Sequence, residues 1–145
     1  MFLERCAVKR KDARKEVMSL CFEYSFKPDA DPAEIYALAL ETRLPSDDGY
    51  IRETFFGIVG HLEFIDGLIS EYSKGWKTSR ISPVALAIMR TAIYEICFRE
   101  DVPDAAAINE AIELVREYDD EKKVRPFVNG ILNSVMKNKP QEPAS

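Results

Sequence analysis

The stretch PVALAIMRTAIYEICFR, residues 83–99, decides the fold. It follows Ser82, a favourable N-cap residue, and its apolar side chains point in every direction around a helix. These side chains are Val84, Leu86, Ile88, Met89, Ile93, Tyr94, Ile96 and Phe98. A helix that is apolar on all sides belongs in the core of a protein. We therefore expect a central helix that two groups of helices share.

Helical spacing of apolar residues is also present on the N-terminal side of this stretch. It predicts a first helix over about 9–26 and a second over about 32–43, which begins after Asp31 as N-cap. A turn at 44–49 precedes a long helix that ends near Ser73. In this helix an apolar residue recurs every three or four positions, namely Ile51, Phe55, Ile58, Leu62, Ile65, Ile69 and Tyr72. Such a seam predicts one continuous helix that packs along its length.

Two further helices are expected on the C-terminal side. The first covers about 104–118 and presents Ile108, Ala111, Ile112 and Val115 to the core. The segment DDEKKVRP, residues 119–126, links it to a last helix with Val128, Ile131, Leu132 and Val135 on its inner face. We find no alternating pattern typical of strands.

The expected fold is therefore all-α, with two packed helical bundles of about three helices each. A chain of 145 residues with 46% hydrophobic and 31% charged residues is typical of one globular domain. We place this domain at 1–138, with subdomains of about 1–76 and 77–138. Residues 139–145 are polar and contain prolines, so we expect a flexible tail there.

Cysteines and apolar runs point to a reducing, aqueous environment. Cys6, Cys21 and Cys97 have a spacing that fits no metal or redox motif, which favours buried free thiols. The start, MFLERCAVKRKD, lacks the apolar segment of a signal peptide. No apolar run reaches the roughly 18 residues of a membrane span. We expect a cytoplasmic protein without membrane contact.

Enzyme signals are absent from the sequence patterns. His61 is the single histidine, and no Ser or Cys has a histidine near it in the sequence. There is no phosphate-binding glycine loop and no metal-ligand spacing. A lone histidine of this kind is typical of a surface or packing position. We predict no catalysis, no cofactor and no metal site.

Positive charge is concentrated at the start of the first helix. Residues 1–16 carry a formal charge of +3, so the rest of the chain carries −8, because the whole carries −5. The basic segment consists of Lys9, Arg10, Lys11, Arg14 and Lys15. Such asymmetry indicates a local anion site on an otherwise acidic protein.

A helical wheel separates part of this basic segment from the expected core. The core stripe is Ala13, Val17, Leu20 and Tyr24, whereas Lys11, Lys15, Met18 and Phe22 lie roughly opposite, and Arg10 and Arg14 lie between the two. One interpretation is a solvated basic face with Phe22 packed under a neighbouring helix. The other is a phosphate-binding helix start with an aromatic side chain for base stacking, which suits single-stranded nucleic acid.

Two charges interrupt the central apolar helix. Arg90 and Glu95 are expected to form an ion pair or network, because an unpaired buried guanidinium is too costly. We expect Arg90 to pair with Glu110, or with Glu113, on the next helix. This makes Arg90 a structural residue.

Four segments carry a family resemblance. IMRTAIYEI (88–96), DVPDAAAINEAIEL (101–114) and FVNGIL (127–132) resemble the NusB family of bacterial transcription antitermination factors. KRKDARKEVMSLCFEYSF (9–26) is similar to the basic first helix of that family. The resemblance implies two packed helical bundles and no enzymatic activity. It also implies binding of boxA, a short single-stranded RNA in ribosomal RNA operon leaders, together with NusE on elongating RNA polymerase.

The resemblance also implies site residues. The basic segment matches the RNA-binding segment of the family, and Phe22 and Phe127 match aromatic residues that the family brings to RNA. Lys123 and Arg125 offer a second basic patch beside Phe127. Two departures are Asp12, which interrupts the basic run, and Ala85, which stands where several members carry a Glu that faces NusE.

Two alternatives remain open from the sequence. One is a helical protein-interaction module that does not bind RNA. The other is an accessory RNA-binding domain like those of RNA methyltransferases, although 145 residues leave no room for the methyltransferase itself. The sequence also leaves open whether the free protein is a homodimer.

Overall fold

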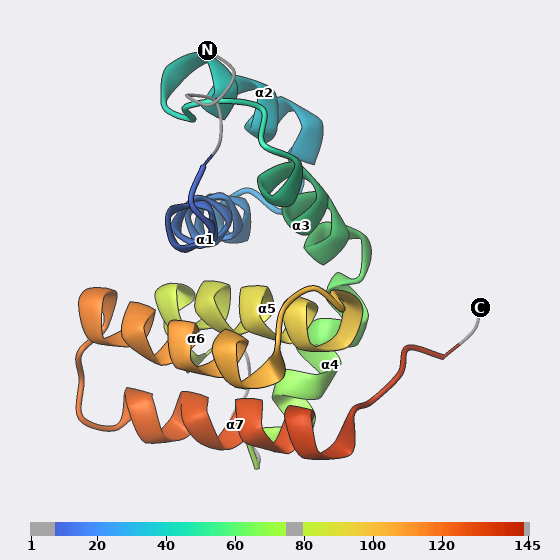
Figure 1. The fold of residues 1–145 in the computed structure, drawn as a ribbon, viewed down its shortest axis with the longest axis vertical. Helices are drawn as coiled ribbons and strands as arrows, with labels where there is room; N and C mark the ends of the chain where they lie inside the picture. Colours follow the sequence, from blue (N-terminus) through green and yellow to red (C-terminus); the bar gives the residue numbers. More distant parts are fainter. Residues whose placement is uncertain (1–7, 75–79, 144–145) are drawn as a thin grey trace.

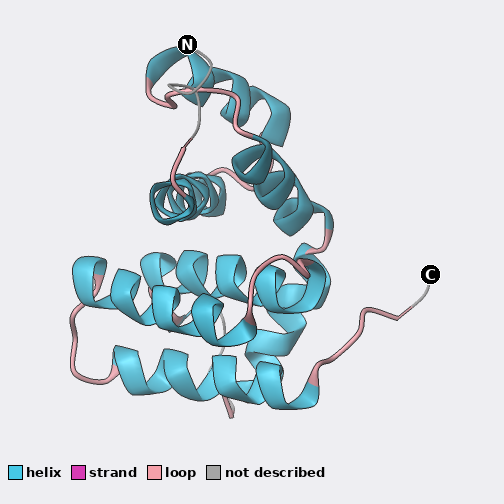
Figure 2. Cartoon of the chain, viewed as in Figure 1, coloured by secondary structure: helices cyan, strands magenta, loops and turns pink. Residues whose placement is uncertain are grey.

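The computed structural model describes residues 8–74 and 80–143. These residues form seven helices joined by turns and loops, with no strand, so the predicted all-α class is confirmed (Figure 2). The helices are α1 (Arg10–Phe26), α2 (Pro32–Thr42), α3 (Gly49–Gly60), α4 (Leu62–Tyr72), α5 (Pro83–Phe98), α6 (Asp104–Tyr118) and α7 (Val124–Asn138). Among the described helices, none has the length and apolar character that crossing a membrane requires.

Helix α5 is the central element, as its sequence predicts. It contacts α1 and α3 on one side and α4, α6 and α7 on the other. In Figure 1, α1 is seen end-on above α5. Helices α6 and α7 lie on the lower side of the picture and run alongside α5. The expected boundary between the two groups, near residues 76 and 77, lies outside the described residues.

The helix expected to run unbroken to Ser73 is two helices in the structure. α3 ends at Gly60, and His61 adopts φ −118° and ψ 23° before α4 begins at Leu62. The break allows α3 to pack against α1 while α4 packs against α7. Apolar spacing continues across the break, which is why the sequence pattern did not reveal it.

Aromatic side chains surround this break. The His61 ring stacks on the Phe98 ring, with the two centroids 4.3 Å apart. The Tyr94 ring also stacks on Phe98, with centroids 5.1 Å apart. A Cβ atom at Gly57 would lie 2.3 Å from the Tyr94 side chain. With Tyr94 in this position, any side chain larger than that of glycine at residue 57 would displace the end of the Tyr94 ring.

Side-chain caps fix where several helices begin. Asp31 accepts a hydrogen bond from the Ala33 N–H at the start of α2, and Asp48 accepts one from Ile51 at the start of α3. Ser82 accepts one from Ala85 at the start of α5. These contacts satisfy N–H groups that have no partner within the helix.

The C-terminal segment contacts the body of the protein. Lys139 donates from Nζ to the Ile96 carbonyl at 3.1 Å and to Asp104 at 2.9 Å. Glu142 lies 2.7 Å from His61 Nδ1. Residues 139–143 are not helical, but these contacts connect them to α5, α6 and the break after α3.

Two described cysteines are free thiols in apolar surroundings. Cys21 is buried and Cys97 is partly buried. Burial raises the pKa of Cys21 to about 12 and that of Cys97 to about 11, so both thiols are neutral at physiological pH. Cys6 lies outside the described residues. In residues 8–74 and 80–143 no cluster of His, Cys, Asp or Glu is arranged to hold a metal.

Candidate nucleic-acid interface

The basic segment lies where α1 begins. Lys9 is the N-cap residue, and no side chain caps the first N–H groups of the helix. Lys9 and Lys11 are exposed, and Arg10 and Lys15 are half-buried. The free N–H groups and the helix dipole add positive potential to that of the side chains. The geometry therefore favours an anion at this helix start.

Arg14 does not belong to the exposed basic face. Its side chain is buried, and Nε donates to both carboxylate oxygens of Glu95 at 3.0 Å. The Tyr50 hydroxyl donates to the same carboxylate at 2.8 Å. Burial is the largest single influence and lowers the pKa of Arg14, but the hydrogen bond to Glu95 and the negative charge of Glu95 together with its neighbours raise the pKa overall. The expectation that Arg14 lies on the anion-binding face is wrong, because α5 covers this side of α1.

The helical wheel of α1 did not reveal the burial of Arg14, because α1 is buried on two sides. It packs against both α3 and α5. Met18 and Cys21 are buried together with Ala13, Val17 and Leu20 of the predicted core stripe, whereas Tyr24 is half-buried. One apolar stripe in a sequence does not reveal a second helix that covers the adjacent face.

Arg90 pairs with a different acid from the one expected. Nε and Nη2 of Arg90 donate to the two carboxylate oxygens of Asp66 at 2.9 and 2.8 Å. Asp66 lies on α4, whereas Glu110 lines the groove between α1 and α6. The expected pair of Arg90 and Glu110 is therefore wrong, because Arg90 faces α4.

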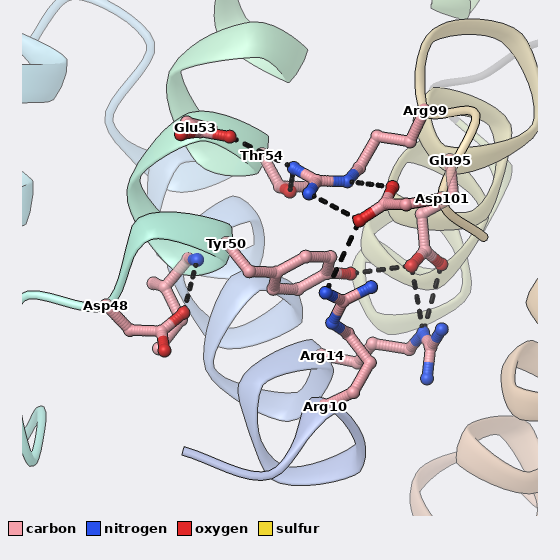
Figure 3. A network of polar contacts seen from close by, with 10 residues as sticks. Arg10, Arg14, Asp48, Tyr50, Glu53, Thr54, Glu95, Arg99 and Asp101 are labelled. Atoms are coloured by element: carbon pink, nitrogen blue, oxygen red, sulfur yellow. Dashed lines mark hydrogen bonds and ion pairs between the residues drawn. The ribbon is translucent and has the colours of Figure 1, made fainter. Parts of the chain in front are cut away.

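Arg10 is held against a tyrosine ring. Its guanidinium carbon lies 4.2 Å from the centroid of the Tyr50 ring, and Nη2 lies 3.5 Å from Oδ2 of Asp101. Figure 3 shows the Tyr50 ring between Arg10 and Arg99, whose guanidinium carbon is 4.9 Å from the ring centroid. Tyr50 thus contacts Arg10 with its ring and Glu95 with its hydroxyl.

Asp101 is fixed by a second arginine. Arg99 donates two hydrogen bonds to the Asp101 carboxylate, at 3.0 and 2.9 Å, and also lies 3.4 Å from Glu53 (Figure 3). The hydrogen bonds from Arg99 lower the pKa of Asp101 to about 2. The carboxylate is therefore ionised throughout the physiological range.

Lys15 lies at a groove between α1 and α6. Its Nζ is 3.2 Å from the Glu117 carboxylate. The groove has a volume of about 200 Å³, and its charged lining consists of Lys11, Arg14, Lys15, Glu110, Glu113, Arg116 and Glu117. Within residues 8–74 and 80–143, Lys9 and Lys11 are the members of the basic segment that have no ion-pair partner.

An aromatic groove continues along α1. Phe22 is 36% exposed and lines a hollow of about 290 Å³ with Met18, Ser19, Val84 and Tyr118. It is therefore not packed under a neighbouring helix. Tyr118, at the end of α6, is 46% exposed. Sequence reasoning did not identify Tyr118, since only the fold brings it beside Phe22.

Phe127 and Lys123 line a separate pocket of about 280 Å³. It lies between the start of α5 and the loop before α7, and Ile81, Ala85 and Val124 complete its apolar wall. Arg125 lines a different groove, with Ile112, Lys122, Pro126 and Asn129. Its Nε lies 3.9 Å from Asp120. The structure thus brings Phe127 and Lys123 together but directs Arg125 elsewhere.

The described residues form an all-helical protein with a group of cations at the uncapped start of α1. The chain belongs to the NusB family, whose family model, described as "NusB family", matches residues 11–137. It is 42% identical over 131 residues to the transcription antitermination protein NusB of Acetivibrio thermocellus, and the match covers 90% of each chain. It is 33% identical to that of Bacillus pumilus, with 93% of this chain and 100% of the relative covered.

Solved structures agree with this assignment. NusB of T. maritima has a TM-score of 0.80 and 33% identity, with 94% of both chains covered. A structure described as antitermination factors NusB and NusE in complex with dsRNA has a TM-score of 0.78 and 23% identity, with 89% of this chain and 96% of that chain covered. The latter likeness is evidence for the shared fold. The family consists of transcription antitermination proteins and not of enzymes.

Proposed function

We propose that this protein binds a boxA-type single-stranded RNA of ribosomal RNA operon leaders, together with NusE, and acts in the cytoplasm on elongating RNA polymerase. The observation that carries the proposal is the cation group at the uncapped start of α1, formed by Lys9, Arg10, Lys11 and Lys15. Family membership supports it, and so does a solved relative that was crystallised with NusE and RNA.

Phosphate groups are the expected ligands of this cation group. Lysine offers a mobile point charge, whereas Arg10 is held on the Tyr50 ring and offers a planar set of N–H donors from that position. The free N–H groups of the first turn of α1 add donors for a phosphate oxygen. The acidic remainder of the protein, at −8, disfavours RNA elsewhere on the surface.

Two exposed aromatic side chains, Phe22 and Tyr118, and the half-buried Phe127 favour a single strand over a duplex. Phe22 and Tyr118 line one groove beside Lys15, and Phe127 lines the pocket that also contains Lys123. Unpaired bases stack on such rings, whereas bases in a duplex are already stacked on each other. We propose that the aromatic groove and the pocket each receive an unpaired base.

NusE is proposed to bind beside the Phe127 pocket. Ala85 is 2% exposed and forms part of the wall of this pocket, so it offers no acidic contact to a partner. The half-buried side chain of Val124 in the same wall provides apolar area that a partner could bury, whereas Ile81 is already buried. The overall acidic charge suits a basic partner.

A titration at several fixed NusE concentrations tests this proposal. Fluorescence anisotropy of a labelled boxA single strand should report tighter binding as NusE increases, and by linkage RNA should strengthen NusE binding by the same factor. A duplex of the same sequence should bind more weakly. Binding of NusE without any binding of RNA would favour the protein-interaction module instead.

A further inference from the structure

Two of the four cations at the start of α1 form ion pairs with carboxylates from distant parts of the chain. Arg10 lies 3.5 Å from Asp101, in the loop between α5 and α6, and Lys15 lies 3.2 Å from Glu117, near the end of α6. The two acids therefore flank the start of α1 from different elements. Lys9 and Lys11 have no such partner within the described parts of the chain.

The Asp101 carboxylate is held in place independently of Arg10. Two hydrogen bonds from Arg99 orient it, and Arg99 is in turn placed by Glu53 and the Tyr50 ring (Figure 3). Its low pKa keeps it negative at every physiological pH. Asp101 thus presents a permanent charge beside Arg10 and is not a freely moving surface side chain.

Glu117 is placed by the packing of α6 on α5, the helix on which α1 also packs. It lines the groove that contains Lys11 and Lys15, together with Glu110 and Glu113. Arg116 also lines this groove and lies 3.3 Å from Glu113, so a phosphate that approaches Lys15 meets chiefly the carboxylates of Glu117 and Glu110. It must then replace the Glu117 contact and also tolerate the neighbouring negative charge.

We propose that Asp101 and Glu117 are affinity-determining residues of the RNA site, acting as built-in counterions of Arg10 and Lys15 that RNA phosphates must displace. This inference rests on the proposed RNA function. A strand with consecutive phosphates engages Lys9 and Lys11 as well, so its other contacts offset the displacement. An isolated anion at Arg10 or Lys15 has no such compensation.

Neutral, nearly isosteric substitutions test the proposal. Asp101→Asn, Glu117→Gln and the double variant are titrated with a labelled single-stranded boxA RNA at low and moderate salt. Each single variant should bind the RNA about two- to five-fold more tightly than the original protein. The upper limit follows because the loss of an exposed ion pair changes an affinity by at most about five-fold. The gain should shrink at high salt, because screening weakens exposed pairs.

Glu63→Gln is the matched control. It changes the net charge by the same amount, but Glu63 is an exposed residue in the first turn of α4, away from the basic segment. Its effect on RNA affinity should stay below about two-fold, since distant exposed charges are largely screened. A gain as large as that of Glu117→Gln would mean that net charge alone sets the affinity and would overturn the proposal.

The outcomes separate this inference from the proposed function. Folded variants that bind RNA as weakly as the original protein, or more weakly, would show that Asp101 and Glu117 position the cations and do not compete with RNA. Glu117→Gln gives this answer even if Asp101→Asn disturbs Arg99. Absence of RNA binding by the original protein and by every variant would reject both proposals together.

Discussion

Arg14 and Glu95 place two opposite charges between α1 and α5, where water barely reaches them. Arg14 is 7% exposed and Glu95 is 1% exposed. The pair is tolerated because Nε of Arg14 contacts both carboxylate oxygens and the Tyr50 hydroxyl provides a third hydrogen bond. Removing one partner leaves the other charge buried without compensation.

Arg14→Ala is therefore expected to destabilise the fold strongly. A buried pair that loses one member typically costs about 3–5 kcal/mol in the free energy of unfolding. Urea denaturation followed by circular dichroism measures this change. Lys11→Ala, on the same helix but exposed, should change the free energy of unfolding by less than about 0.5 kcal/mol. Equal stabilities of the two variants would contradict the buried pair.

Phe22 tests the aromatic groove. Phe22→Ala should weaken single-stranded RNA binding by about 1–3 kcal/mol, because a base loses its stacking partner. The melting temperature should change little, since the ring is 36% exposed. Phe26→Ala is the control, because Phe26 is 61% exposed and packs edge-on against Phe22, 5.0 Å away, but does not line the groove. Equal losses of affinity in both variants would argue against stacking in this groove.

At the scale of the elements, the break at His61 determines how the helices pack. It directs α3 toward α1 and α4 toward α7. The Arg90 contact with Asp66 then ties α4 to α5. A single straight helix could not make both sets of contacts, because its two halves would share one direction.

Two glycines allow a matched test of this packing. Gly57→Ala should reduce stability by about 1–3 kcal/mol, because the new Cβ forces the Tyr94 side chain out of its place. Gly67→Ala, on α4 with no heavy atom within 4 Å of the new Cβ, should instead stabilise by about 0.5–1 kcal/mol. Chemical denaturation of both variants checks the opposite signs. A stabilising effect at Gly57 would show that α3 and α5 are not in close contact there.

Most helices follow from sequence patterns, but their contacts do not. The apolar character of 83–99 and the caps Asp31 and Ser82 are local features, so the sequence predicts them directly. The break at His61 interrupts no apolar spacing, and the burial of Arg14 depends on how α5 crosses α1. Both are consequences of tertiary packing, which a single helical wheel does not contain.

The same distinction applies to the candidate site. The positions of Lys9 and Lys11 at an exposed helix start follow from the charge pattern and the helix boundary. Tyr50, Asp101, and the adjacent pair Glu117 and Tyr118 come from three other segments and meet α1 only in the folded chain. None of them belongs to the basic segment, so charge clustering in the sequence could not identify them.

At the scale of the whole molecule, the uneven charge distribution determines where RNA can approach the protein. A body of −8 carries a cationic helix start, and carboxylates of that body already contact two of its cations. Long-range attraction of RNA is therefore weak, and binding depends on short-range contacts at α1. Under the proposed function, a basic partner that docks on the acidic body would remove part of this repulsion.

The salt dependence of RNA binding tests the central claim most directly. The dissociation constant of a boxA single strand is measured across a series of salt concentrations for the original protein and for the Lys9→Ala, Lys11→Ala double variant. Each lost phosphate contact should reduce the slope of log K against log salt by about 0.7. We expect a slope shallower by about 1.4 and weaker binding at low salt, with an unchanged melting temperature. An unchanged slope and affinity would show that RNA does not bind at the start of α1.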